Sequence, residues 1–183
     1  MENKTIKLNS GKIISIRKEL DMKITKYFHI IQNENVMSKK AIAAGQGSGF
    51  DLKQLYNTIT QLQEKRIIIK GMLNALNNGI TSFDINTFKT TNNYNIFAAG
   101  EAKEAISQLK IVLKNTLNPA EKAKKGLKNI GKKEVFTSAK LNQLIKDLQL
   151  KANTYDAKLE DFNNNTELDV TNCSSSIEEF LTI

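Results

Sequence analysis

The strongest chemical signal in the sequence is a run of lysines between residues 121 and 133. Six lysines stand there against a single acid, Glu121: Lys122, Lys124, Lys125, Lys128, Lys132 and Lys133. The whole chain of 183 residues has a net charge of +8, and this segment supplies much of the excess. Such a concentration of positive charge attracts phosphate groups or an anionic surface at modest salt. These lysines are therefore our candidate anion-binding residues.

Two interpretations of the lysine run stay open. Nucleic-acid binders usually combine their cations with stacking aromatic side chains or with base-reading arginines. Here Phe136 is the nearest aromatic residue, and no arginine accompanies the lysines. We favour a solvated, charged connector, and we keep non-specific contact with nucleic acid or with anionic lipid as the alternative.

Residues that could catalyse a reaction are scattered along the chain. Catalysis needs a base beside a nucleophile, or carboxylates held close together. We interpret the single His29 as solvated or structurally hydrogen-bonded, and the single Cys173 as an incidental thiol. Glu101 and Glu104 have the spacing of a helix surface and lack the histidine of an E-x-x-H metal motif. We therefore expect no enzyme activity, no metal and no cofactor, and we predict no small-molecule substrate.

The elements that would position these residues are long amphipathic helices. Apolar residues recur at steps of three and four, which predicts helices over about 10–35, 51–78, 96–117 and 137–162. A single proline and the absence of tryptophan suit helix seams better than a β-sandwich. The predicted fold is all-α, with four long helices in an antiparallel bundle or in paired helical hairpins. Residues 80–95 are expected to form a loop, with a short β-hairpin as the alternative.

The last predicted helix has the most regular seam. Seven consecutive core-type positions are apolar, at alternating steps of four and three: Leu141, Ile145, Leu148, Ala152, Tyr155, Leu159 and Phe162. Such a stripe packs against partner helices, within the chain or in another subunit. We therefore take these positions as candidate interface residues.

The second predicted helix has a similar seam with one interruption. Its core-type positions are Leu52, Leu55, Ile59, Leu62, Arg66, Ile69, Leu73 and Leu76. Arg66 either pairs with a buried acid and so sets the register, or packs its aliphatic stem while its charged head reaches water. We favour the second interpretation.

The sequence divides into a helical domain, residues 1–170, and a C-terminal tail, residues 171–183. In the tail, Ser176 and Glu179 form a capping-box pattern, and three residues would share one apolar face: Ile177, Phe180 and Leu181. We favour docking of this face on the chain's own helices over presentation to another protein. No apolar run approaches the ~20 residues of a membrane span, and the first ten residues lack a secretory signal. We expect a cytoplasmic protein, with a virion as the alternative.

Two stretches are similar to a known family. Leu73–Thr81 resembles a signature of the form Ile-Asn-x-x-Asn…Thr, and residues 155–168 resemble Leu-Asp-x-x-Ile-Gln-x-x-Asn-Trp-Thr-Thr-Glu-Leu. Both belong to the septicolysin-like family of small helical proteins, and the resemblance covers about residues 7–168. The matching positions in the second stretch are Asp156, Asn163, Thr166, Glu167 and Leu168.

The chain also departs from the family pattern. Asn164 stands where the family has tryptophan, Gly100-Glu101 replaces an Arg-Asp pair, and the lysine run replaces an Arg-Tyr-rich segment. The resemblance implies a helical fold, and the family's name suggests a pore-forming cytolysin. We expect the side chains of Asn77, Asn163 and Thr166 to satisfy free backbone groups at helix ends.

These observations together predict a non-enzymatic, oligomeric module with a structural, assembly or protein-interaction role, of phage or bacterial origin. Its expected partners are further copies of itself or other subunits of an assembly. The alternatives are a septicolysin-like, membrane-active protein and a non-specific nucleic-acid binder that uses the lysine run.

Overall fold

The computed structural model describes residues 6–35, 45, 48–117 and 135–167, and all the regular secondary structure of this part of the chain is helical, with no strand. The elements are α1 (Ser10–Glu34), α3 (Leu52–Asn77), α4 (Ile85–Phe88), α5 (Asn92–Leu117) and α7 (Ser138–Asn165). The prediction of an all-α protein is confirmed. α3, with 26 residues, is about 39 Å long at 1.5 Å per residue.

Side-chain caps fix where the long helices begin. The Asn9 side chain accepts a hydrogen bond from the backbone N–H of Lys12 at 2.8 Å, so Asn9 is the N-terminal cap of α1. Asp51, at the predicted start of this helix, caps α3, because its carboxylate accepts from the N–H groups of Lys53 and Gln54. These backbone hydrogen bonds also hold the pKa of Asp51 below its ordinary value.

The end of α3 is closed by the glycine that the sequence places there. Gly79 has φ +73°, which is the left-handed conformation that glycine adopts at little cost. Its N–H donates to the carbonyl of Leu76, and the N–H of Ile80 donates to that of Ala75. This pair of bonds is a Schellman motif, which satisfies carbonyls that the helix leaves free.

Residues 80–95 are not a loop with a β-hairpin: they contain α4, and α5 begins at Asn92. The Asp84 carboxylate accepts from the N–H of Thr87 at 2.7 Å and starts the short turn. Phe88 is then buried against the backbone of α3, where a Cβ built on Gly71 would lie only 2.4 Å from the phenyl ring. The turn forms because α3 has no side chain at the position where the ring packs.

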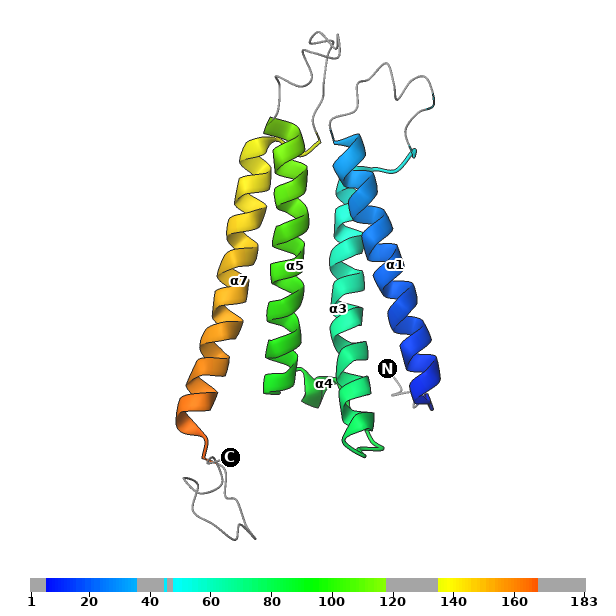
Figure 1. Ribbon diagram of the computed structural model, residues 1–183, viewed down its shortest axis with the longest axis vertical. Coiled ribbons are helices and arrows are strands. Elements are labelled where there is room, and N and C mark those ends of the chain that lie inside the picture. The colour runs from blue at the N-terminus through cyan, green and yellow to red at the C-terminus, as the bar shows by residue number, and fades with distance from the viewer. Residues whose placement is uncertain (1–5, 36–44, 46–47, 118–134, 168–183) are drawn as a thin grey trace, which may run out of the picture.

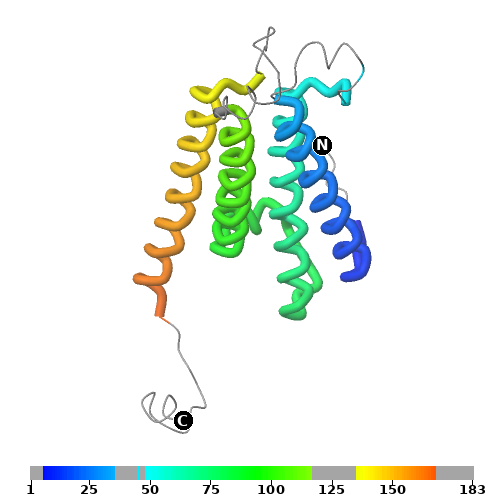
Figure 2. Tube along the Cα trace, turned by 45° about the horizontal axis from the view of Figure 1, so that its top comes forward, coloured from blue at the N-terminus to red at the C-terminus, as the bar shows by residue number. Residues whose placement is uncertain are grey.

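The four long helices lie side by side in the order α1, α3, α5, α7 and run alternately in opposite directions (Figures 1 and 2). α1 packs extensively on α3, and α5 on α7, whereas α3 and α5 contact each other much less. Contact is therefore strong within each sequential pair and weaker between the two pairs.

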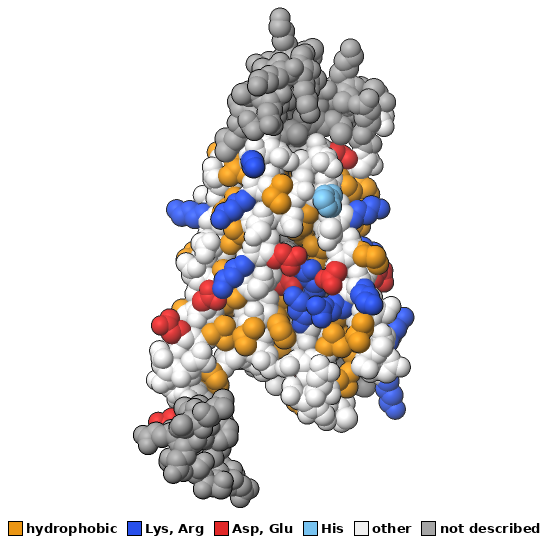
Figure 3. All heavy atoms as spheres, viewed as in Figure 1, with side chains coloured by type: hydrophobic (Ala, Val, Ile, Leu, Met, Phe, Trp, Pro, Cys, Tyr) orange, Lys and Arg blue, Asp and Glu red, His pale blue; other side chains and the backbone are white. Residues whose placement is uncertain are grey.

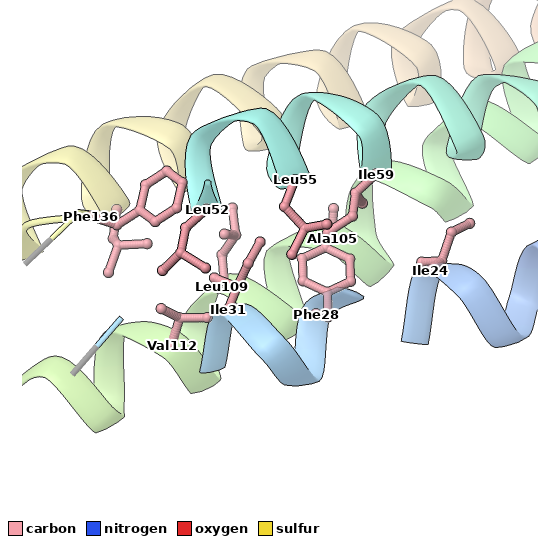
Figure 4. Close-up of a cluster of buried hydrophobic side chains, with 11 residues drawn as sticks. Ile24, Phe28, Ile31, Leu52, Leu55, Ile59, Ala105, Leu109, Val112 and Phe136 are labelled. Atoms are coloured by element: carbon pink, nitrogen blue, oxygen red, sulfur yellow. The ribbon is translucent and has the colours of Figure 1, made fainter. Parts of the chain in front are cut away.

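The main apolar core lies at the end of the molecule where α1 and α5 finish and α3 and α7 begin (Figure 4). We call this region the apolar end. Side chains from all four long helices and from Phe136 meet there, namely Ile24, Phe28, Ile31, Leu52, Leu55, Ile59, Ala105, Leu109, Val112, Phe136 and Leu141. Burial of these side chains stabilises the fold by removing apolar area from water.

One buried amide fastens the apolar end. Asn35, the C-terminal cap of α1, is 2 % exposed. Its Nδ2 donates to the Phe136 carbonyl at 2.9 Å and to Thr116 Oγ1 at 3.0 Å, while its Oδ1 accepts from the Phe136 N–H at 2.7 Å. Asn35 thus ties the end of α1 to α5 and to the segment that enters α7.

Candidate functional site

The midpoint of the molecule holds a cluster of charged side chains from three helices, which we call the charged belt. Its members are Asp21 of α1, Arg66 and Lys70 of α3, and Glu101 and Glu104 of α5. In Figure 3 acidic and basic side chains gather at the centre of the face shown. The belt connects the α1–α3 pair to α5, across the boundary where the two helix pairs contact each other less.

Arg66 is the centre of the belt, and the interpretation that its head reaches water is wrong. The residue is 5 % exposed, and its guanidinium is bidentate on Glu101, with Nε 2.7 Å from Oε1 and Nη2 donating to Oε2. Nη2 also lies 2.7 Å from Glu104 Oε2, and Nη1 lies 2.8 Å from Asp21 Oδ1. The three carboxylates accept hydrogen bonds from the guanidinium, so the head group does not have to reach water.

Glu101 is the buried anion that the sequence analysis placed on a helix surface. It is 4 % exposed and receives a second cation, because Lys70 Nζ lies 2.8 Å from its Oε1. Its position in the chain carried the signal: Ala98, Glu101 and Ala105 follow the seam spacing of α5, and both alanines are buried. A charge inside an apolar stripe predicts a charged partner.

The environment keeps Arg66 ionised. Burial alone would lower its pKa, but the hydrogen bonds to Glu101 and Asp21 and the charges of Glu101 and Glu104 outweigh burial and raise the pKa above its ordinary value. Arg66 therefore acts as a fixed charge and structural tie, and not as a proton donor.

A cleft of about 330 Å³ opens beside the belt, toward the α4 end of the molecule. Its lining comes from α1, α3 and α5: Arg17, Lys70, Leu73, Asn74, Asn77 and Phe97. A second cavity, of about 420 Å³, lies on the other side of Asn74, between the end of α3, α4 and the start of α5, and Phe83 and Phe88 form part of its wall.

An aromatic row joins α4 to α7 at the same end. The ring centroids of Phe83, Phe88, Tyr94 and Tyr155 follow one another at 5.1, 5.7 and 6.3 Å. The Tyr94 hydroxyl donates to Glu64 at 3.1 Å. Burial, and then the charge of Glu64, raise the pKa of Tyr94, so this phenol stays neutral into alkaline pH.

The two predicted seams are buried to different extents. On α3, Leu52, Leu55, Ile59, Arg66 and Ile69 are buried and Leu62 is half-buried. On α7, the buried residues are Leu141 and Ala152 alone. Four further seam positions are half-buried, namely Ile145, Leu148, Tyr155 and Leu159. Phe162, the last of the seam, is 45 % exposed.

Other predicted residues have simpler outcomes. His29 is exposed. The lysines from Lys122 to Lys133, the tail residues Ile177, Phe180 and Leu181, and Cys173 lie outside the described residues.

The helix-end asparagines that bond to the backbone lie one or two positions away from the predicted ones. The amide of Asn78, not of Asn77, donates to the carbonyl of Asn74 at 2.8 Å, and the amide of Asn165, not of Asn163, donates to that of Asp161 at 2.9 Å. The physical role is as expected, but the register of the bonding side chain is set by the local geometry of each terminus.

Neither a metal centre nor a membrane span is present in the described ranges. No three His, Cys, Asp or Glu residues of this part are grouped so that they could hold a metal ion. None of its helices is both long enough and apolar enough to cross a bilayer.

Comparisons with protein-family models, with curated proteins and with solved structures found no match to this chain. The resemblance to septicolysin-like proteins therefore stays a prediction.

Proposed function

We propose that this chain is a non-enzymatic assembly module that associates with further copies of itself through the outer face of α5 and α7. The observation that carries the proposal is the incomplete burial of α7. This helix has 28 residues, yet only two of them are buried, although its seam is the most regular in the sequence. An apolar stripe that the described residues of its own chain leave half covered is a candidate contact for a second copy.

The pairing of α5 with α7 shows where the uncovered apolar surface lies. Lys103 Nζ of α5 lies 2.9 Å from Asp156 Oδ2 of α7 and fixes their antiparallel register. Ile96 precedes Lys103 by seven residues and Phe162 follows Asp156 by six, so these two apolar residues lie at about the same level. Ile96 is 50 % and Phe162 45 % exposed. Figure 3 shows apolar side chains on the lower part of these helices.

A second copy is the occupant that this surface fits best. About two helical turns from Ile96 and Phe162 lie one cation, Lys103, and one anion, Asp156, whose side chains are about half exposed. A two-fold axis through such a surface sets each charge of one copy near the opposite charge of the other. We further propose that the fold works as two helical hairpins, α1–α3 and α5–α7, of which the second presents this surface.

The test is the mass of the protein in solution, by light scattering on a sizing column at micromolar concentration. The wild type is expected to elute as an oligomer, and the double variant Ile96→Ser/Phe162→Ser as a monomer. Met22→Ser is the matched control, because Met22 is 66 % exposed on the far helix α1. A wild type that is monomeric throughout, or an oligomer that the double variant leaves intact, would contradict the proposal.

The membrane-active and nucleic-acid-binding alternatives depend on the lysine run. No contact among the described residues favours either alternative over self-association. Leakage of vesicles that contain anionic lipid would support the first. Salt-sensitive binding of nucleic acid, lost when four of the lysines become glutamine, would support the second.

A further inference from the structure

The cleft beside the charged belt is built from hydrogen-bond donors and apolar surface. Among the described residues that line it, two are cations and two are primary amides, and none is a carboxylate. Leu73 and Phe97 supply an apolar wall. A concave site with convergent polar groups on an apolar wall is the usual form of a small-molecule pocket.

The helix register separates the two signs of charge. On α1, Arg17 lies one turn before Asp21; on the antiparallel α3, Lys70 lies one turn after Arg66. Both cations therefore stand on the α4 side of the belt, while the carboxylates stay around Arg66. Figure 3 shows this order, with basic side chains below acidic ones at the centre of the face. The five members of the belt have one more carboxylate than cation, but the cleft beside them is lined by two cations, Arg17 and Lys70.

The guanidinium N–H groups of Arg17 are available to a ligand. Its closest acidic partner is Asp21, with Nε 3.8 Å from Oδ2, which is too long for a hydrogen bond. No hydrogen bond from its guanidinium to another described residue is present. Lys70, by contrast, is held by Glu101 at 2.8 Å. Arg17 is therefore the group that can turn to a ligand without breaking the belt.

We propose that this cleft binds a small organic anion, a carboxylate or phosphate ester that carries a short apolar chain. Arg17 receives the anionic group together with Lys70, the amides of Asn74 and Asn77 donate to its remaining oxygens, and the chain lies along Leu73 and Phe97. The sequence predicted no small-molecule substrate, and the proposal concerns binding only. It does not depend on self-association.

The test is a binding titration of the full chain, in which binding is measured by amide chemical shifts and by calorimetry. The probes are octyl phosphate, octanoate and inorganic phosphate. Octyl phosphate and octanoate are expected to bind and to shift the signals of Lys70, Asn74 and Asn77. Inorganic phosphate is expected to bind at least about tenfold more weakly, because it makes no apolar contact. Equal affinity for inorganic phosphate and octyl phosphate, or no binding of either chain-bearing probe at millimolar concentration, would overturn the proposal.

Two variants separate the cleft from general attraction by a basic protein. Arg17→Gln removes the cleft cation, and Lys18→Gln removes the same charge from an exposed neighbour that does not line the cleft. Affinity should fall about tenfold in Arg17→Gln and stay within about twofold in Lys18→Gln. An equal loss in both variants means non-specific attraction and overturns the proposal.

A vesicle arm identifies the source of the anion. Vesicles of phosphatidylglycerol present the same chemistry as a lipid headgroup. Binding that Arg17→Gln weakens and Lys18→Gln does not would support the cleft as a headgroup site. Vesicle binding that both variants retain, together with soluble probes that respond to Arg17 alone, would support a free metabolite-sized anion.

Discussion

The apolar end and the charged belt hold the same helices together by different means. At the apolar end, four helices bury a continuous cluster of aliphatic and aromatic side chains around Phe28, Leu109 and Phe136. At the belt, three helices meet through one guanidinium and three carboxylates. The first contact depends on area and tolerates changes of shape, whereas the second depends on partners that must all be present.

The difference teaches where the molecule is free to carry function. The apolar end uses a buried amide, that of Asn35, for a structural tie. The belt and the α4 end carry both cavities that are lined by described residues, and the α4 end also carries Phe162, the exposed last residue of the α7 seam. The two proposed binding surfaces therefore lie outside the main apolar core. Four changes, taken from the largest expected effect to the smallest, test this contrast.

Loss of the belt's central cation should have the largest effect. Arg66→Met leaves Glu101 buried with Lys70 as its remaining partner, and we expect the free energy of unfolding to fall by about 3–5 kcal/mol. Urea denaturation measures the change. The double variant Arg66→Met/Glu101→Leu should recover much of the loss, since it also removes the stranded charge. A double variant as unstable as the single one would show that the belt acts by shape and not by charge.

Loss of the tie at the apolar end should rank second. Asn35→Ala removes three hydrogen bonds and leaves the N–H and carbonyl of Phe136 buried without this partner. We expect a destabilisation of about 2–3 kcal/mol in the same assay. Asn33→Ala, at an exposed position of the same helix, is the control and should change little. If Asn35→Ala is as mild as the control, the apolar end rests on packing alone.

Two glycines offer a matched pair at the α4 end. Gly71→Ala places a methyl group 2.4 Å from the ring of Phe88, whereas a Cβ at Gly100 meets nothing within 4 Å. Gly71→Ala should destabilise the fold by about 1–3 kcal/mol, and Gly100→Ala should stabilise it by about 0.5–1 kcal/mol. Thermal unfolding by circular dichroism reads both. Equal shifts would mean that α4 does not pack on α3 as described.

Alkaline pH should affect the aromatic row slightly and selectively. The unfolded chain releases the Tyr94 proton near pH 10.0, but the folded protein holds it to higher pH because burial and Glu64 raise this pKa. The stability due to Tyr94 is thus complete below about pH 10 and is lost as pH rises further. Tyr94→Phe should lose less stability between about pH 9 and pH 11 than the wild type. Tyr27→Phe controls for the loss of one phenol.

Much of the secondary structure could be predicted because it depends on neighbours in the chain. The spacing of apolar residues located all four long helices, and Asp51 and Gly79 marked the limits of α3 by local hydrogen bonds and backbone freedom. The errors fell where a local signal competed with packing. The spacing of Phe83, Ile85 and Phe88 is too short to show a helical repeat. α4 forms because the Phe88 ring packs on α3 at Gly71, which has no side chain.

The candidate site was harder to predict because its members come from three helices. Arg66 interrupts the apolar seam of α3 in the sequence, and Glu101 likewise interrupts the apolar seam of α5. Periodicity predicts that a residue faces inward but does not identify the residue that it contacts. Without an identified acidic partner, the sequence favoured the interpretation that the charged head of Arg66 reaches water. Arg17 gave no signal, because its role depends on the antiparallel register of α1 against α3.

The sequence by itself determined the helices, their apolar faces and most of their ends, since these follow from interactions within a few residues. Only the tertiary structure decided the partners: that Arg66 meets Glu101 across 35 residues, that Asn35 reaches Phe136 across 101, and that α7 stays half covered. Such contacts depend on how whole helices align, and an amphipathic stripe is compatible with many alignments until charge pairing and close packing select one.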